Sequence, residues 1–399
     1  MEQRFVLIGI CDSQFQELPA AVLQIIARGK IFSGGRRRHQ LMESRLPAGH
    51  KWIDVTVPLS DVYAQYAEAT DEIVVFVSGD PLFFGFASTL RRQFPGCRLR
   101  VFPTFNSLQM LAHRMQLPYQ SMRCVSLTGR DWDGLDRALI EGEALIGCLT
   151  DRQKTPQTVW ERMATYGFTN YQMTVGEQLG NEEAERVAEF EPEHAYAFPN
   201  CLILQRREVR QRPFGIPESD FHLLDGRARM ITKMPVRLLS LSLLDLRHRT
   251  SFWDIGFCTG SVSIEAKLQF PHLRITAFEV RQEGRRLMEL NSRRFGTPGI
   301  TTVIGDFLES DLSQLPRPDA IFVGGHGGRL EEMLCRLHEV ALPGATLVFN
   351  SVSDESHALF LRAAAASGFT LCGQTRIAID EHNPITILKA TKAHCDDTI

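Results

Sequence analysis

Short runs of β-branched and aromatic residues alternate with longer amphipathic stretches along almost the whole chain. This alternation predicts an α/β fold with mostly parallel sheets, because a helix is the usual connection between two parallel strands. The runs expected to form strands are 4–10, 72–78, 98–102, 123–127, 144–149, 172–176 and 200–205 in the first half, and 251–255, 274–280, 301–304, 320–323, 346–350, 370–379 and 385–389 in the second. Only a turn-like segment separates the last two runs, so we expect the final strand to run antiparallel to its predecessor, at an edge of the sheet.

A charged segment, 205–213, divides the chain of 399 residues; it ends in Pro213 and has no apolar periodicity. Charge, Pro and Gly without periodicity are typical of linkers between domains. We therefore predict two domains, residues 1–207 and 208–399. Each half is long enough to bury a core of its own without metals or disulfides.

The composition excludes several classes of protein. A net charge of −3 gives no broad positive field, which argues against a nucleic-acid partner. The nine Cys form neither a CxxC nor a zinc-finger spacing, so we expect no metal site and a reducing compartment. The longest apolar stretch, 73–90, is interrupted by Ser-Gly-Asp-Pro, so it does not predict a membrane span. A cytoplasmic protein without a membrane partner is expected.

Residues 253–265 combine an apolar strand, a Gly-containing turn and the start of a helix. In doubly wound sheets such a turn brings backbone N–H groups close to a nucleotide, although a lone Gly-rich turn is weak evidence and an ordinary strand–helix turn is the alternative. Glu279 lies in the next expected strand, 274–280, where a carboxylate accepts hydrogen bonds from both ribose hydroxyls. Asp306 follows the third strand, at a position suited to an adenine amino group, and the Gly-rich residues 324–328 follow the fourth.

These features resemble the class I S-adenosylmethionine methyltransferase fold, a Rossmann-like domain with an antiparallel seventh strand. Oxidoreductases share the first turn but normally carry G-x-G-x-x-G, whereas here Cys258 stands at the middle Gly position of the methyltransferase loop. We expect Arg281, two residues beyond Glu279, to be solvated. The resemblance implies a methyl-donor site formed by Thr232, Asp254, Gly256, Gly260, Glu279, Asp306, Gly324 and Gly325.

The first half has its own signature at 78–85, Ser-Gly-Asp-Pro-Leu-Phe-Phe-Gly, directly after a buried strand. An ordinary β-turn is the alternative, since Gly-Asp-Pro is good turn chemistry. Its order with Ser-Gly-Gly-Arg-Arg-Arg-His at 33–39 and the loops at 103–108 and 126–130 resembles the tetrapyrrole methylase family, the class III S-adenosylmethionine methyltransferases. That family usually has a Gly-rich loop after its first strand. This chain keeps a single Gly there. The resemblance implies a donor site formed by Gly9, Gly79, Asp80, Pro81, Ser107 and Gly129.

Together the two halves resemble, over nearly the whole chain, a family of bifunctional methyltransferases of corrin (cobalamin) biosynthesis. The implied architecture is a two-subdomain tetrapyrrole methylase fold followed by a seven-stranded class I methyltransferase domain. The implied reaction is S-adenosylmethionine-dependent methylation of a precorrin at meso carbon 5 by the first domain. The second domain is implied to methylate meso carbon 15 and to decarboxylate the ring C acetate. Relatives of each domain associate, which implies a homo-oligomer.

A precorrin is a polyanion, so its cleft should be locally basic, and Arg pairs with carboxylates in a bidentate manner. A solvated cationic surface is the equal alternative. Phe83 and Phe84 are candidates to face the flat macrocycle. For catalysis we expect Asp80, Lys233 and His326, although Asp80 also suits a turn cap and a lone His is more often without function. The candidate substrate-binding residues are Arg36, Arg37, Arg38 and Arg130.

The methyl of a sulfonium is already electrophilic, so the enzyme mainly aligns the reactants and excludes water. We therefore expect neither a catalytic triad nor a metal. Two other functions stay open. The second domain resembles some RNA methyltransferases, and the first domain, with its reduced Gly loop, would serve equally as a silent module that holds substrate.

Overall fold

The computed structural model of the protein describes residues 3–227, 229–379 and 384–393. The chain forms two compact units. The first holds the chain up to Asp131 together with 143–160 and 170–208, and the second holds 132–142, 161–169 and the chain from Val209 onward. No helix in the described parts is both long and apolar enough to cross a membrane.

The first sheet is fully parallel, with the strand order β3-β2-β4-β1-β5. Its core strands, β1 and β4, are buried on both faces, which matches their continuous apolar sequences. Two of its strands, β2 and β3, were not expected; each is only four residues long and mixes apolar with polar residues. The elements are β1 (Arg4–Ile10), α1 (Ala20–Arg28), β2 (Ile31–Gly34), α2 (Arg36–Met42), β3 (Lys51–Asp54), α3 (Ser60–Glu68), β4 (Ile73–Ser78), α4 (Phe86–Gln93) and β5 (Arg98–Phe102).

The second sheet has the order β6-β7-β10-β8-β9, and only its β6–β7 pair is parallel. The expected parallel pairing was wrong for most of this sheet. The unpredicted short strand β9 follows β8 without an intervening helix and pairs antiparallel to it, and β10 is antiparallel to both of its neighbours. The elements are α5 (Ser107–Arg114), β6 (Arg123–Ser126), α6 (Asp133–Glu141), β7 (Leu145–Leu149), α7 (Pro156–Thr165), β8 (Tyr171–Glu177), β9 (Arg186–Glu189) and β10 (Asn200–Arg206).

The third sheet has seven strands in the order β13-β12-β11-β14-β15-β17-β16, of which the first five are parallel. As expected, the last strand, β17, is antiparallel to β16. Its expected place at the edge was wrong, because β17 lies between β15 and β16. The burial explains the order: Ile387, Leu388 and Ala390 of β17 are fully buried, whereas β16 is exposed along most of its length. Residues 380–383 of the connecting turn lie outside the described chain.

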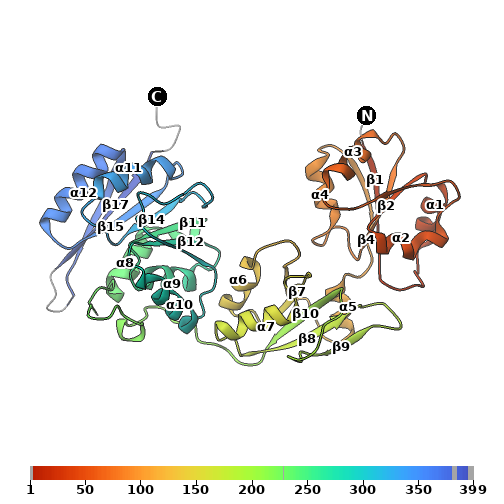
Figure 1. The fold of residues 1–399 in the computed structure, drawn as a ribbon, viewed down its shortest axis with the longest axis horizontal. Coiled ribbons are helices and arrows are strands. Elements are labelled where there is room, and N and C mark those ends of the chain that lie inside the picture. Colours follow the sequence, from red (N-terminus) through yellow and green to blue (C-terminus); the bar gives the residue numbers. More distant parts are fainter. Residues whose placement is uncertain (1–2, 228, 380–383, 394–399) are drawn as a thin grey trace. The chain divides into compact units, whose positions relative to one another are not determined.

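Helices cover both faces of this sheet (Figure 1). Alternate residues of β11 point to opposite faces, so Phe252 packs with Val236 and Val262 on one side, while Trp253 packs with Leu334 and others on the other. The elements are α8 (Met234–Leu243), β11 (Ser251–Ile255), α9 (Ser261–Gln269), β12 (Arg274–Glu279), α10 (Glu283–Phe295), β13 (Ile300–Ile304), β14 (Ala320–Val323), α11 (Leu330–Val340), β15 (Thr346–Ser351), α12 (Asp354–Ser367), β16 (Phe369–Ile377) and β17 (Ile385–Lys392).

Candidate active site

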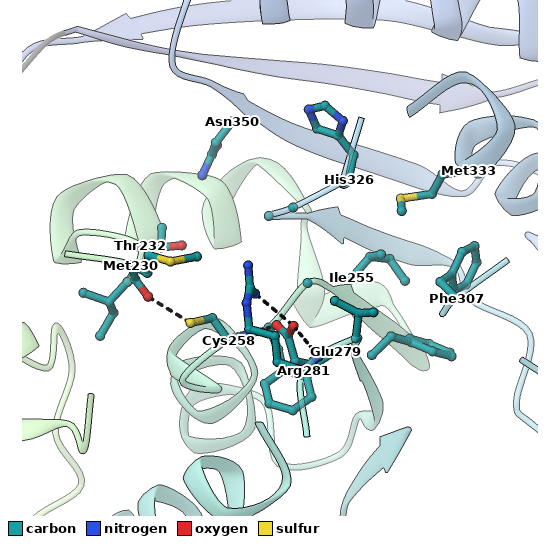
Figure 2. Close-up of a pocket in the computed structure, with 18 of the residues that line it drawn as sticks. Met230, Thr232, Ile255, Cys258, Glu279, Arg281, Phe307, His326, Met333 and Asn350 are labelled. Atoms are coloured by element: carbon teal, nitrogen blue, oxygen red, sulfur yellow. Dashed lines mark hydrogen bonds and ion pairs between the residues drawn. The ribbon is translucent and has the colours of Figure 1, made fainter. Parts of the chain in front are cut away.

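The carboxyl ends of the parallel strands of the third sheet open into a cavity of about 860 Å³ (Figure 2). Residues 229–233, directly before α8, form another part of its wall. The volume lies within the range of roughly 300–1,000 Å³ that is common for small-molecule sites. The place agrees with the rule that doubly wound sheets bind ligands at the carboxyl ends of their strands.

Two Gly-containing loops meet at the floor of this cavity. Gly256 has φ +77°, and a Cβ there would lie 2.8 Å from the backbone N of Gly325. Only Gly therefore allows the loop after β11 to touch the loop after β14. Cys258, at the middle of the first loop, adopts φ +52° and donates its N–H to Glu279 at 2.8 Å. Its thiol donates to the carbonyl of Met230 at 3.1 Å.

Glu279 ends β12 with its side chain almost fully buried. One carboxylate oxygen accepts the Cys258 N–H, and the other accepts the N–H and the guanidinium of Arg281, both at 3.0 Å. Gly284 makes room for this carboxylate, because a Cβ there would lie 2.7 Å from Cγ of Glu279. The expectation that Arg281 is solvated was wrong: the side chain is 35% exposed and lines the cavity as the ion-pair partner of Glu279.

Asp254 and Gly260 support the loop from below and do not line the cavity. One oxygen of the fully buried Asp254 accepts the N–H and the hydroxyl of Ser263, at 3.1 and 2.6 Å, while the other has no partner among the described residues. Burial, reinforced by the charge of Glu279, raises the pKa of Asp254 to about 7 in spite of those two hydrogen bonds. Gly260 directly precedes α9 and has φ +78°, and a Cβ there would lie 2.7 Å from the sulfur of Met288.

Two further residues of the cavity follow strand ends: Asp306 comes after β13, and His326 comes after β14. Asp306 pairs with the guanidinium of Arg329 at 3.0 Å and accepts the N–H of Leu308. His326 is half-buried, and burial lowers its pKa. Its Nδ1 lies 3.2 Å from the N–H of Gly328 and accepts that hydrogen bond, so the neutral ring carries its proton on Nε2.

The cavity brings together most of the residues expected in the second domain: Thr232, Lys233, Gly256, Glu279, Asp306, Gly324, Gly325 and His326. Sequence reasoning missed Arg229, Arg281, Arg329, Met333 and Asn350, which also line it. Asn350 occupies the end of β15 and Arg281 follows the end of β12, so the strand-end rule was signal enough for both. Nothing in the sequence pointed to Met333.

The first unit contains a much smaller cavity, of about 70 Å³, lined among others by Gly79 and Ser107. Gly9 stands behind it, with no room for a side chain: a Cβ would lie 1.8 Å from the carbonyl oxygen of Gly79. Gly79 in turn has φ +62° and would place a Cβ 2.8 Å from Cα of Asn106. These two glycines allow three loops to pack against one another.

Asp80, Pro81 and Gly129 do not line this smaller cavity. The carboxylate of Asp80 accepts the N–H of Leu82 at 2.8 Å, as a turn cap does. Pro81 is buried, and the exposed Gly129 donates its N–H to Asp151 at 3.0 Å.

The arginines of α2 differ in their contacts. Arg37 pairs with Asp12 at 2.7 Å, and Arg38 donates to the hydroxyl of Ser78. Arg36 is exposed. Elsewhere in the unit, the guanidinium of Arg130 lies 5.1 Å from the ring centre of Phe84, which is 40% exposed and has φ +50°. No group of three or more His, Cys, Asp or Glu in the described residues is arranged to hold a metal ion.

Comparison with known proteins identifies both halves. Residues 4–193 match the tetrapyrrole (corrin/porphyrin) methylases, and residues 223–397 match the precorrin methyltransferase domain. A precorrin-6Y C(5,15)-methyltransferase [decarboxylating] from a Sinorhizobium species is 32% identical over 386 residues, which cover 95% of this chain and 91% of the relative. The chain belongs to the precorrin-6Y C(5,15)-methyltransferase (decarboxylating) family.

Shorter relatives of this precorrin-6Y methyltransferase family match part of the chain. A cobalt-precorrin-6B C(15)-methyltransferase (decarboxylating) from Salmonella typhimurium is 38% identical over 138 residues, or 35% of this chain and 70% of the relative. A crystal structure of a precorrin-6Y C(5,15)-methyltransferase from Geobacter metallireducens, 30% identical, covers 46% of this chain and 100% of its own, with a TM-score of 0.42. The chain is thus a methyltransferase, and the expected order of a tetrapyrrole methylase domain and a second methyltransferase domain is confirmed.

Proposed function

We propose that the protein methylates a precorrin at meso carbons 5 and 15 with S-adenosylmethionine and releases the carboxyl group of the ring C acetate as carbon dioxide, in cobalamin biosynthesis. The observation that carries this is the cavity of about 860 Å³ with the buried Glu279 and the touching loops of Gly256 and Gly325, in a chain of this family. We assign meso carbon 5 to a domain of residues 1–207. Meso carbon 15 and the decarboxylation are assigned to residues 208–399. The name of the shorter relative, a C(15)-methyltransferase (decarboxylating), supports this division.

The larger cavity fits the methyl donor, which supplies an electrophilic methyl group when bound. A carboxylate has about four acceptor positions, and Glu279 uses three of them, so the fourth remains for a ribose hydroxyl. A second hydroxyl is accommodated if the guanidinium of Arg281 moves aside. Gly256 and Gly325 leave the floor free of side chains, and Asp306, with Thr232 and Gly324, completes the proposed contacts.

The segment before α8 brings positive charge to the cavity of the second domain. The side chains of Arg229 and Lys233 line the cavity without a hydrogen bond or ion pair to any described residue, whereas the charge of Arg329 is balanced by Asp306 and Glu332. A local excess of positive charge attracts a polyanion. We propose that Lys233 binds the carboxylate of the acetate arm that is decarboxylated. His326 would act as a neutral hydrogen-bond donor that orients the ring, since its lowered pKa disfavours the charged form.

Decarboxylation breaks the bond between the carboxylate carbon and the methylene carbon of the acetate arm. The conjugated macrocycle takes up the electron pair, and a proton from water then converts the methylene carbon into a methyl group. The chain therefore needs no further electron-accepting group. Its residues hold the substrate in line with the donor and exclude water.

We propose a second methyl-donor site in the first domain. Gly79 and Ser107 support a donor site because they line its small cavity. Asp80 is proposed to contact donor or substrate from the adjoining turn, beside Gly9, Pro81 and Gly129. Substrate carboxylates would bind Arg36 and Arg130, whereas Arg37 and Arg38 already hold loops through Asp12 and Ser78. We propose a cytoplasmic homo-oligomer without nucleic-acid or membrane partners.

One observation favours a second candidate: the first cavity, at about 70 Å³, is far smaller than a donor. The first domain would then hold substrate for a single methyltransferase. Titration of the purified protein with S-adenosylmethionine by calorimetry separates the two. Two sites per chain, one weakened by Asp80→Ala and the other by Glu279→Ala, support two methyltransferase domains. A single site, lost only with Glu279→Ala, makes the first domain a binding module.

Mass spectrometry of the product tests the chemistry. The proposal requires a precorrin that gains two methyl groups and loses one carbon dioxide. A product with one added methyl group, unchanged by Asp80→Ala, contradicts the assignment of the first domain.

A further inference from the structure

Met230, Ile231 and Thr232 form a short piece of the cavity wall, which we call the wall segment. Side chains from outside the segment hold both of its ends. The thiol of Cys258 donates to the carbonyl of Met230 at 3.1 Å, and Arg237 donates to the carbonyl of Thr232 at 2.9 Å. Figure 2 shows the first of these contacts crossing from the loop after β11 to the wall.

The Arg237 end of the wall segment is fixed by an ion pair with no solvent exposure. Arg237 bonds Glu265 at 3.2 Å, and both side chains are fully buried. Glu265 also accepts the N–H groups of Gly215 and Ile216, at 2.8 and 3.1 Å. One buried pair therefore anchors the chain both before and at the end of the wall segment.

The Cys258 end depends on one side chain in an unfavourable backbone conformation. At φ +52° a residue with a Cβ is disfavoured and Gly is preferred. The thiol has the Met230 carbonyl as its acceptor, and burial raises the pKa of Cys258, which keeps the S–H donor intact. The backbone conformation at position 258 thus favours glycine, yet the Cys258 side chain at this position holds the wall segment.

We propose that Cys258 is a positioning residue, whose thiol holds the wall segment against the bound donor and so increases the affinity of this cavity for S-adenosylmethionine. The inference rests on the proposed function of the cavity. It predicts that affinity and stability respond in opposite directions to one substitution. A general weakening of the fold would lower both.

The test compares Cys258→Gly, Cys258→Ala and Cys258→Ser, with Cys335→Ala, at an exposed position of α11, as the matched control. We expect Cys258→Gly and Cys258→Ala to raise the Kd for S-adenosylmethionine about fivefold, the effect of one ordinary hydrogen bond. Cys258→Ser, which keeps a donor, should stay within about twofold of the wild type. The melting temperature of Cys258→Gly without ligand should equal or exceed that of the wild type.

Hydrogen exchange gives a reading that does not depend on the donor. The amides of residues 231–233 should exchange faster in Cys258→Gly than in the wild type. Unchanged exchange, an unchanged Kd, or a Kd that rises only as the melting temperature falls overturns the inference. A wild-type protein that binds no S-adenosylmethionine at this cavity overturns the proposed function itself, which separates the two failures.

Discussion

The two Gly-containing sites of this chain differ in what surrounds the glycines. Around Gly256 and Gly325, the contacts of Glu279, Cys258 and Arg281 border an open cavity of about 860 Å³. Around Gly9 and Gly79, the loops close on one another and leave about 70 Å³. Glycines thus permit close backbone approach at both sites, and the side chains of the neighbouring loops decide whether that approach leaves room for a ligand.

The loop after β1 shows how the smaller site is closed. Asp12 pairs with Arg37, and Ser13 donates to Glu182, which lies between β8 and β9. The amide of Gln16 bonds the carbonyls of Cys11 and Ser13 at 2.8 and 2.5 Å. These polar contacts take the place of a flexible Gly-rich loop.

The largest effect should come from Gly9→Ala. A Cβ 1.8 Å from the carbonyl of Gly79 forces the backbone apart, at a cost of about 3 kcal/mol or more. Thermal unfolding followed by calorimetry should show an earlier transition for the first unit. Gly35→Ala is the control, because the nearest atom to its Cβ is 3.7 Å away. Equal melting of the two variants would contradict the close approach.

Glu279→Ala should weaken S-adenosylmethionine binding at the second site about 100-fold, the value of two charge-assisted hydrogen bonds. Binding at the first site should not change, which calorimetry would show. Glu289→Ala, an exposed carboxylate on α10, is the control. If both sites weaken together, the two cavities are not independent.

Asp254→Asn should change the pH dependence of the second domain alone. The folded-state pKa of about 7 lies above the unfolded value, so this group's contribution is full below about pH 4 and is lost as the pH rises through 7. We therefore compare the difference in melting temperature, variant minus wild type, at two pH values. This difference should be larger at pH 8 than at pH 5 by roughly 3 °C or more. Asp254 belongs to the second unit, so the pH dependence of the first unit's unfolding transition should be the same in the two proteins. A constant difference between the two proteins would argue against a raised pKa.

Asp12→Asn should have the smallest effect. It weakens a partly exposed ion pair, which is worth at most about 1 kcal/mol. If closure of the loop competes with donor binding, the Kd of the first site should fall about threefold, because a larger fraction of molecules is open. Lys30→Ala, which breaks the exposed pair with Asp71, is the control. A raised Kd would mean that the ion pair belongs to the binding-competent state.

The sequence predicted those parts of the fold that carry long apolar runs. All seven strands of the third sheet were expected, including the four-residue β14, whose residues are all apolar. The strands β2, β3 and β9 are equally short but mix apolar with polar residues, and they were missed. The antiparallel direction of β17 followed from its short connection. The position of β17 between β15 and β16 depends on how deeply each strand is buried in the folded sheet. The residues next to β17 in the sequence do not determine this.

The site was predictable where the strand-end rule applies, as for Glu279, Asp306 and His326. Contacts between segments distant in sequence were not, such as the thiol of Cys258 on the carbonyl of Met230. For Asp254 the sequence indicated the loop correctly but not that the side chain lies beneath it, since a buried and a ligand-facing carboxylate look the same in one sequence.

The raised pKa of Cys258 has a practical consequence for chemical labelling. Alkylating and oxidising reagents attack the thiolate, and burial together with Glu279 keeps this thiol protonated near neutral pH. Cys335 and Cys372 are exposed and should react first. A fluorophore attached at these surface cysteines would therefore leave the donor cavity chemically intact, with Cys258 still in its reduced form.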